Sequence, residues 1–275
     1  MSEEKLMLEL AVVSDEIALD IREAMRYGLQ WGFRKYELRC LGSYAKRIPF
    51  VDAADLDYID GLRKENKIEI SALSPGTFKI KPLQKNELHR ELNETLPRTF
   101  ALAHRLGVKK IITFGFLRDE TPEEQVVELI GRAGRMALQE GLLLAIENEP
   151  GAYCDTGENS ARIIRTLGMK NIGINWDPGN ALASGEVPFP NGYEQIKPYL
   201  VNLHVKDGVA TPKIEWRLVN DGGVNWLGQL TAIIREHNLP FVTLETHVDP
   251  FLESSRENLT RLRLILQTAA QLAVA

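Results

Sequence analysis

Residues 121–147 read TPEEQVVELIGRAGRMALQEGLLLAIE, a helical pattern that runs directly into a strand pattern. Thr121 predicts the N-cap of the helix, Pro122 its first turn and Gly141 its end. The apolar run at 142–147 that follows has the composition of a buried strand. The same alternation continues along the chain, because short β-rich runs are separated by longer stretches with helical spacing.

Eight such strands are predicted, and the stretches between them read as helices, such as the one expected from Ser14 to Gly28. The strands are expected at 8–13, 34–39, 67–73, 109–114, 142–147, 172–177, 200–205 and 240–245. Strands bounded by helices favour βαβ units and a parallel sheet. Eight units in one uninterrupted chain of 275 residues predict the α/β class and a single (β/α)8 TIM barrel, forming one domain over residues 1–275.

A doubly wound open sheet is the alternative fold. Its nucleotide-binding forms carry a glycine-rich G-x-G-x-x-G turn after the first strand. Here that junction reads AVVSDEIA at 11–18, and no G-x-x-x-x-G-K-[ST] motif occurs in the chain. Nucleotide binding by either mechanism therefore lacks support.

The composition of the chain indicates which partners it can bind and in which cellular compartment it is expected. The formal net charge of −5 disfavours a polyanion such as DNA, which binds basic surfaces. Two cysteines, Cys40 and Cys154, form no C-x-x-C motif and indicate a reducing compartment. The acidic start MSEEKLMLEL lacks an apolar signal segment, and the longest apolar runs are too short to span a bilayer. We therefore expect a soluble cytoplasmic protein that binds neither nucleic acid nor a membrane.

The ends of four consecutive strands carry side chains that can bind a metal, and TIM barrels place their functional residues at such ends. They are Glu147 in AIENEP, Asp177 in NWDPG, His204 in NLHVKD and Glu245 in TLETH. Adjacent parallel strands lie about 4.8 Å apart, so four neighbouring ends can converge on one ion. Without a cation, three such carboxylates would repel one another and at least one would be protonated.

Each of these four residues alone has a simpler interpretation. A glutamate can cap a helix or pair with a basic side chain, an aspartate before Pro-Gly can be a turn residue, and a histidine on an apolar strand can be a satisfied core residue. The four together favour a metal site, because a carboxylate at the inner end of an apolar strand is costly unless it is paired or coordinated. Two glutamates, one aspartate and one imidazole suit a single Mn²⁺, Mg²⁺, Co²⁺ or Zn²⁺ ion.

Further polar residues are candidates for contacts with a substrate. Glu37, close to Arg39 at the second strand, either reaches the site or forms an ion pair. His247 and Lys206 each follow a candidate ligand by two positions and so point the same way from an extended strand. The Lys206 cation can bind an oxyanion or offset the negative charge of the site. Glu149, just beyond the fifth strand, can touch substrate or solvent.

The four candidate ligands resemble the metal site of the xylose isomerase-like TIM barrels. More narrowly, they resemble the sugar phosphate isomerase/epimerase group, which contains ketose 3-epimerases and the isomerases and dehydratases of inositol catabolism. The stretches that carry the resemblance are LAIENEP, GINWDPGNALASGE, VNLHVKDG, NDGGVNWLGQL and TLETH. The resemblance covers most of the chain and is strongest from about 140 to 247.

This resemblance implies a metal-dependent isomerase or epimerase that acts on a small keto-sugar or polyol derivative. The metal would chelate a carbonyl oxygen and a neighbouring hydroxyl oxygen and acidify the adjacent C–H. Glu147 or Glu245 would remove that proton to give an ene-diolate, and the opposite glutamate would return a proton from the other face. Loss of a β-hydroxyl from the same intermediate would instead make the protein an inosose-dehydratase-like lyase. The dimers and tetramers common in the family imply a homo-oligomer.

Two positions depart from the pattern of the family. Many relatives have a histidine three residues after the strand-six aspartate, where this chain has Asn180, and we expect Asn180 to face the site and contact substrate. The endonuclease IV-like hydrolases need more histidines at strand ends than the two found here, His204 and His247. The epimerases often place an arginine after the strand-seven histidine, where this chain has lysines, so substrate anchoring is expected to differ. A binding protein that kept the metal but lost catalysis is a further alternative.

Overall fold

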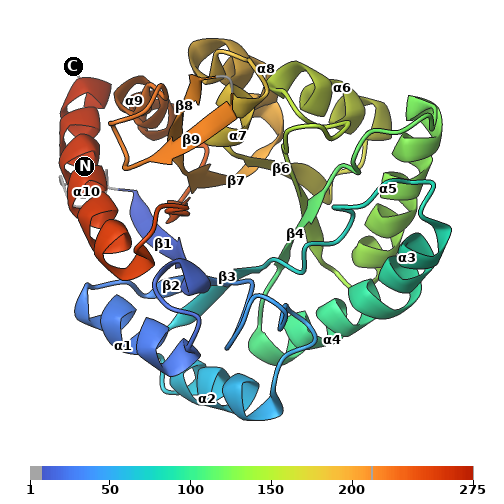
Figure 1. Cartoon of the computed structure of the whole chain (residues 1–275), viewed down its shortest axis with the longest axis horizontal. Coiled ribbons are helices and arrows are strands. Elements are labelled where there is room, and N and C mark those ends of the chain that lie inside the picture. The colour runs from blue at the N-terminus through green and yellow to red at the C-terminus, as the bar shows by residue number, and fades with distance from the viewer. Residues whose placement is uncertain (1–7, 212, 275) are drawn as a thin grey trace.

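The fold is a closed barrel, seen in a computed structural model that describes residues 8–211 and 213–274. Its parallel strands follow the order β1-β10-β7-β6-β5-β4-β3-β2, with helices around the outside (Figure 1). The strands are β1 (Glu9–Val13), β2 (Lys35–Leu38), β3 (Glu69–Leu73), β4 (Lys110–Phe114), β5 (Leu143–Glu147), β6 (Ile172–Trp176), β7 (Leu200–Val205) and β10 (Phe241–Leu244). Each predicted strand range contains one of these strands, so the (β/α)8 barrel is confirmed and the doubly wound open sheet is excluded.

Helices connect the strands and cover the outer face of the barrel (Figure 1). The α-helices are α1 (Ile21–Gln30), α2 (Ala53–Lys64), α3 (Lys85–Arg90), α4 (Leu96–Leu106), α5 (Glu123–Gln139), α6 (Gly157–Leu167), α7 (Pro178–Ala183), α8 (Tyr193–Ile196), α9 (Trp226–Glu236) and α10 (Phe251–Val274). Short 3-10 and π segments are η2 (Ser14–Glu16), η3 (Glu91–Thr95), η4 (Pro188–Gly192) and η5 (Lys197–Tyr199). None of the helices in the described ranges combines the length and the apolar character needed to cross a bilayer.

The first helix starts later than the sequence suggests. It was expected from Ser14, but α1 begins at Ile21 with Asp20 as its N-cap, whose side chain accepts the N–H of Glu23 at 2.9 Å. The residues directly after β1 form the separate 3-10 helix η2 instead. This difference matters for the site, because all three residues of η2 are buried and two of them are acidic.

The helix of the opening stretch is confirmed with a shifted start. Pro122, not Thr121, occupies the N-cap position of α5, because the backbone of Pro122 is extended (φ −58°, ψ 143°). The helix ends at Gln139, and Gly141 follows in a left-handed conformation (φ +66°) that favours glycine. The predicted stop signal at Gly141 is therefore borne out.

The buried apolar residues form two clusters, one large and one small. Between strands and helices lies one large core, whose bulkiest buried members include Trp176 and Trp226. A second, small apolar cluster joins Ala72, Ile112 and Ala145 on three neighbouring strands. Alternate residues of a strand share a face, so the last residue of β5, two positions after Ala145, points to the same side as this cluster. Glu147 therefore lies on the same face of β5 as the small apolar cluster, next to it along the strand.

An antiparallel hairpin, which the sequence analysis does not predict, follows β7. It pairs β8 (Asp207–Thr211) with β9 (Lys213–Arg217) and lies beside β7 in Figure 1. The buried carboxylate of Asp207 accepts backbone N–H groups from Gly208, Asn220 and Val224 at 2.9 to 3.1 Å. This carboxylate therefore fixes the base of the hairpin and the loop that follows it.

Candidate metal centre and active site

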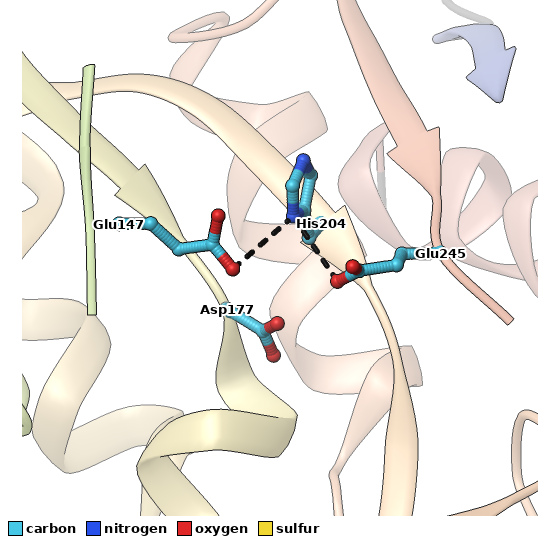
Figure 2. A group of neighbouring side chains, drawn as sticks. All are labelled: Glu147, Asp177, His204 and Glu245. Carbon is cyan, nitrogen blue, oxygen red and sulfur yellow. Dashed lines mark ion pairs between the residues drawn. The ribbon is translucent and has the colours of Figure 1, made fainter. Parts of the chain in front are cut away.

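Four predicted ligands meet at the C-terminal end of the barrel. Glu147 ends β5, Asp177 directly follows β6, His204 belongs to β7 and Glu245 directly follows β10. All four side chains are buried, and one ligand atom from each lies within 4.8 Å of the others. Figure 2 shows the four side chains pointing toward one common space.

The donor set fits one divalent cation. His204 Nδ1 lies 3.2 Å from Glu245 Oε2 and 3.6 Å from Glu147 Oε1. Metal–ligand bonds of about 2.1 Å place two ligands of one ion roughly 3 to 4 Å apart, so these separations suit a shared ion. Three carboxylates and one imidazole are donors that Mn²⁺, Mg²⁺, Co²⁺ and Zn²⁺ accept. The residues therefore fit the expected cation, and its binding stays a prediction.

Asp177 serves two neighbours through its two oxygens. Its Oδ1 accepts the N–H of Asn180 at 2.9 Å and so caps the N-terminus of α7. Its Oδ2 lies 2.6 Å from Lys206 Nζ, within the site. The amide of Asn148 fixes the backbone by accepting the N–H of Asp177 and donating to its carbonyl. The Pro-Gly pair after Asp177 thus begins a helix rather than an isolated turn, and the cap leaves Oδ2 available to the site.

The ammonium of Lys206 neutralises part of the site. Its Nζ lies 2.6 Å from Asp177 Oδ2 and 3.1 Å from Glu245 Oε2, and 4.8 Å from the centre of the Trp216 ring. Burial alone would lower the pKa of Lys206, but the two carboxylates outweigh it and raise the pKa above the usual value. Burial raises the pKa of Asp177 to about 6, against the opposing effect of Lys206. Lys206 is therefore a permanent cation between two carboxylates.

The two glutamates differ in how strongly cations hold them. Glu245 lies 2.6 Å from an Arg39 nitrogen and 3.1 Å from Lys206 Nζ. Burial opposes its ionisation, yet Lys206 and other nearby cations hold the pKa of Glu245 well below its usual range. For Glu147, burial is opposed mainly by the His204 charge, which leaves its pKa lowered. In the described ranges no lysine or arginine lies within ion-pair distance of Glu147, so it is the less neutralised of the two.

Arg39 joins the ends of three barrel strands. Its guanidinium lies 2.9 Å from Asp15 Oδ2, 2.5 Å from Glu16 Oε1 and 2.6 Å from Glu245 Oε1. Arg39 follows β2, the two other acids follow β1, and Glu245 follows β10. We call Asp15, Glu16 and Arg39 the seam cluster, because they lie where β1 and β10 close the barrel. Sequence reasoning missed the two acids because it placed them on a helix, and the available signal was their position directly after a barrel strand.

Glu37 lies behind His204 rather than on the cavity. Its side chain is fully buried, and its Oε2 lies 3.0 Å from His204 Nε2, which leaves Nδ1 toward the other ligands. Of the two predicted alternatives, the structure gives Glu37 an ionic contact, but with this histidine instead of Arg39. The pairing of β2 with β3 shifts register between Tyr36 and Glu37, and Glu37 is not among the residues that line the cavity. The structure thus places Glu37 against a candidate ligand, and its contact with substrate stays a prediction.

Changing Glu37 to glutamine is expected to lower the affinity for a divalent metal by about 10- to 100-fold. A carboxylate on the second nitrogen of a ligating histidine fixes the tautomer and raises ligand basicity, and losing such a partner has this effect in metal sites. Competition with a chromogenic chelator measures the affinity. Glu69→Gln is the control, because this glutamate on β3 is largely exposed and contacts Lys35. Equal affinities of both variants and the unchanged protein would contradict this role for Glu37.

A cavity of about 280 Å³ opens beside the candidate ligands. Its wall is formed by Glu16, Arg39, Cys40, Tyr44, Arg47, Ser74, Lys79, Phe114, Glu147, Glu149, His204, Lys206, Glu245, His247 and Phe251. At about 30 Å³ per water molecule, the volume equals roughly nine waters. It is therefore suited to a small molecule rather than to a polymer chain.

Three of the predicted substrate-contacting residues lie on this wall, and Asn180 does not. Lys206 is one, Glu149 contacts Lys79 at 2.7 Å, and the ring of His247 lies 3.0 Å from Glu16. The Asn180 amide instead donates to the Asn148 carbonyl at 2.8 Å and lies 3.4 Å from Glu147 and Glu149. In the first turn of α7 the amide is thus held against Asn148 and these glutamates, and its contact with substrate stays a prediction.

Solved structures with the same architecture include proteins that bind metals or act on sugars. One is the IOLI protein with a bound zinc atom, with 16% identity, a TM-score of 0.78, and 96% of this chain and 98% of that chain covered. Another is an L-ribulose 3-epimerase, with 15% identity, a TM-score of 0.76 and 96% of both chains covered. A third is a xylose isomerase-like TIM barrel protein from Mycobacterium smegmatis in complex with magnesium, with 17% identity, a TM-score of 0.69 and 100% of both chains covered. At these identities the likeness shows the fold alone.

The sequence itself supplies the family. Among curated proteins none matches this chain. Residues 25–267, however, match the family described as xylose isomerase-like TIM barrel. That range begins within α1, ends within α10 and contains all four candidate ligands. The chain therefore belongs to the xylose isomerase-like TIM barrel family.

Proposed function

We propose that this protein is a divalent-metal-dependent isomerase or epimerase of a small keto-sugar or polyol derivative. The observation that carries the proposal is the placement of two glutamates, Glu147 and Glu245, on the outer two of four neighbouring strands. Asp177 and His204 lie between them. Carboxylates on two sides of one cavity can take a proton from a substrate carbon and return one from the other side.

The residues of the site divide the chemistry among themselves. A divalent cation bound there would polarise the substrate carbonyl and acidify the adjacent C–H. One glutamate accepts the proton and the other donates one, and the roles exchange in the reverse reaction because both directions follow one path. The Lys206 ammonium, in the cavity wall, stabilises negative charge on a substrate oxygen. Return of the proton to the same carbon gives an epimer, and return to the neighbouring carbon gives an isomer.

The similar structures support parts of this proposal. The zinc and the magnesium named for two of them favour a divalent ion here, and the epimerase favours a sugar substrate. An endonuclease IV-like reaction is not supported, since the cavity wall contains two histidines, His204 and His247, in the described ranges. One Mn²⁺, Mg²⁺, Co²⁺ or Zn²⁺ ion as the cofactor, a homo-dimer or tetramer and a cytoplasmic location stay predictions of the sequence.

Elemental analysis followed by incubation with a panel of ketoses in D2O tests the proposal. We expect one divalent ion per chain and deuterium at the carbon next to the carbonyl of the recovered sugar. Treatment with a chelator should stop the exchange, and the added metal should restore it. A product that has lost water would assign the site to an inosose-dehydratase-like lyase instead. Tight metal binding without proton exchange in any sugar would contradict catalysis and favour a binding protein.

A further inference from the structure

Four lysine and arginine side chains line the cavity, and three of them already contact carboxylates. Arg39 contacts the seam cluster acids and Glu245, Lys79 contacts Glu149, and Lys206 contacts two candidate ligands. These ion pairs neutralise the three cations within the protein. The fourth cation, Arg47, therefore stands apart from the others.

Arg47 has a guanidinium without an anionic partner. No carboxylate oxygen lies within 4.0 Å of its nitrogens in residues 8–211 and 213–274, and its Nε is buried without a hydrogen-bond acceptor. Arginine stays charged at all physiological pH values and presents its N–H donors in a planar fork that matches carboxylate and phosphate oxygens. A buried donor without an acceptor is unfavourable, so this wall of the cavity lacks a negatively charged group.

The fold holds the Arg47 side chain in place. The residue belongs to the loop after β2, and its guanidinium packs against Gly76 in the loop after β3, where a Cβ would collide with it. Gly76 also has a φ of +75°, which favours glycine. Ser74, directly after β3, lies on the same wall of the cavity. The guanidinium is thus seated between two loops rather than free in solvent.

Arg47 and Ser74 lie across the barrel from two of the candidate ligands. In the barrel order, β2 and β3 lie opposite β6 and β7, which carry Asp177 and His204 (Figure 1). Arg47 and Ser74 on one side and His204 on the other line the same small cavity. A substrate whose reacting oxygens face the ligands therefore directs its remote end toward Arg47.

We infer that the substrate carries an anionic group, a carboxylate or a phosphate, at the end remote from its reacting carbons, and that Arg47 binds this group. The inference rests on the proposed function, since it defines which keto-sugar derivatives the site accepts. The charge and fork of arginine provide two parallel N–H···O hydrogen bonds to either group. A neutral sugar has no group of this kind and leaves the guanidinium unpaired.

Binding of three matched sugars shows whether the site prefers a carboxylate, a phosphate or a neutral group. The probes are D-fructose, D-fructuronate and D-fructose 6-phosphate, which differ at the terminal carbon only, and isothermal titration calorimetry with the metal-loaded full chain measures their affinities. We expect at least one anion to bind about 10- to 100-fold more tightly than fructose, as for hydrogen bonds to charged groups. The stronger anion identifies carboxylate or phosphate as the group bound.

Variants of Arg47 test whether this residue causes the preference for anionic sugars over fructose. Arg47→Gln should bring the affinity of the anions close to that of fructose, and Arg47→Lys should keep part of the preference because it keeps the charge. Lys46→Gln is the matched control and should preserve the preference, because Lys46 precedes Arg47 in the chain but contacts Asp52 outside the cavity wall. Thermal unfolding confirms that each variant is folded.

The outcomes for the inference and for the proposed function are distinct. An anion preference that depends on Arg47 without proton exchange would uphold the inference about charge and refute the reaction. Proton exchange with equal affinity for all three sugars would uphold the reaction and overturn the inference. An unchanged anion preference in Arg47→Gln would overturn the inference, whether or not proton exchange occurs. The absence of binding by both anions at millimolar concentration would also overturn it.

Discussion

Replacing either Glu147 or Glu245 with glutamine is expected to slow the conversion of the substrate sugar into its epimer or isomer by about 10²- to 10⁴-fold. Glutamine keeps the size and one oxygen donor of the side chain but cannot accept a proton, and general acid–base catalysis by one group contributes factors of this size. Proton NMR in D2O follows both conversion and exchange. We expect each variant to retain exchange for at most one of the two sugars, and the retained sugar to differ between the variants.

A third glutamate provides the control for this experiment. Glu186 is partly buried and accepts the N–H of Gly157 at 2.8 Å, away from the cavity wall. Glu186→Gln should therefore convert sugars at the original rate. Metal content is measured in every protein, because Glu147 and Glu245 are candidate ligands as well as candidate catalytic residues. Near-original conversion by both site variants with metal bound would refute the two-glutamate reaction.

Changing Lys206 to methionine is expected to destabilise the metal-free protein by about 3 to 5 kcal/mol. Removing one member of a buried ion pair leaves the other charge without compensation, and breaking such pairs has costs of this size. Here two buried carboxylates, Asp177 and Glu245, lose their shared ammonium. For a chain of this length the change lowers Tm by roughly 10 °C. Differential scanning calorimetry with and without a divalent metal measures the loss.

Metal should restore much of this stability, because a divalent cation replaces the missing positive charge on the same carboxylates. Lys79→Met is the matched control. Lys79 also contacts a glutamate in the cavity wall, but its side chain is 44% exposed, and exposed ion pairs contribute about 1 kcal/mol or less. Equal Tm values for Lys206→Met and Lys79→Met in the absence of metal would contradict the role assigned to Lys206.

The barrel and its candidate ligands could be predicted because both follow from local sequence. Strands of a parallel barrel are buried on both faces and so appear as short apolar runs, as in LLLAI before Glu147. A charged residue that ends such a run lies at the functional end of the barrel. The order of neighbouring strands then brings these residues together without any knowledge of side-chain directions.

The supporting contacts could not be predicted because they depend on geometry between distant segments. Glu37 meets His204 across 167 positions of sequence, and a one-residue change in the register of β2 would turn this side chain to the opposite face of the sheet. Asp15 and Glu16 depend on the break between β1 and α1, which a helical reading of the same residues conceals. The contacts of Asn180 could not be predicted for the same reason. Its position in α7 brings its amide to the carbonyl of Asn148, 32 positions earlier in the chain.

The seam cluster also affects when, during synthesis, the site can form. Glu245 lies 206 positions after Arg39, so the ribosome completes the first seven barrel strands before the last carboxylate exists. Until then Arg39 has Asp15 and Glu16 as its carboxylate partners in the described ranges, and the ligand set has three of its four members. A nascent chain therefore lacks the complete set, and a cation held by all four residues marks a chain whose last strand has docked beside the first.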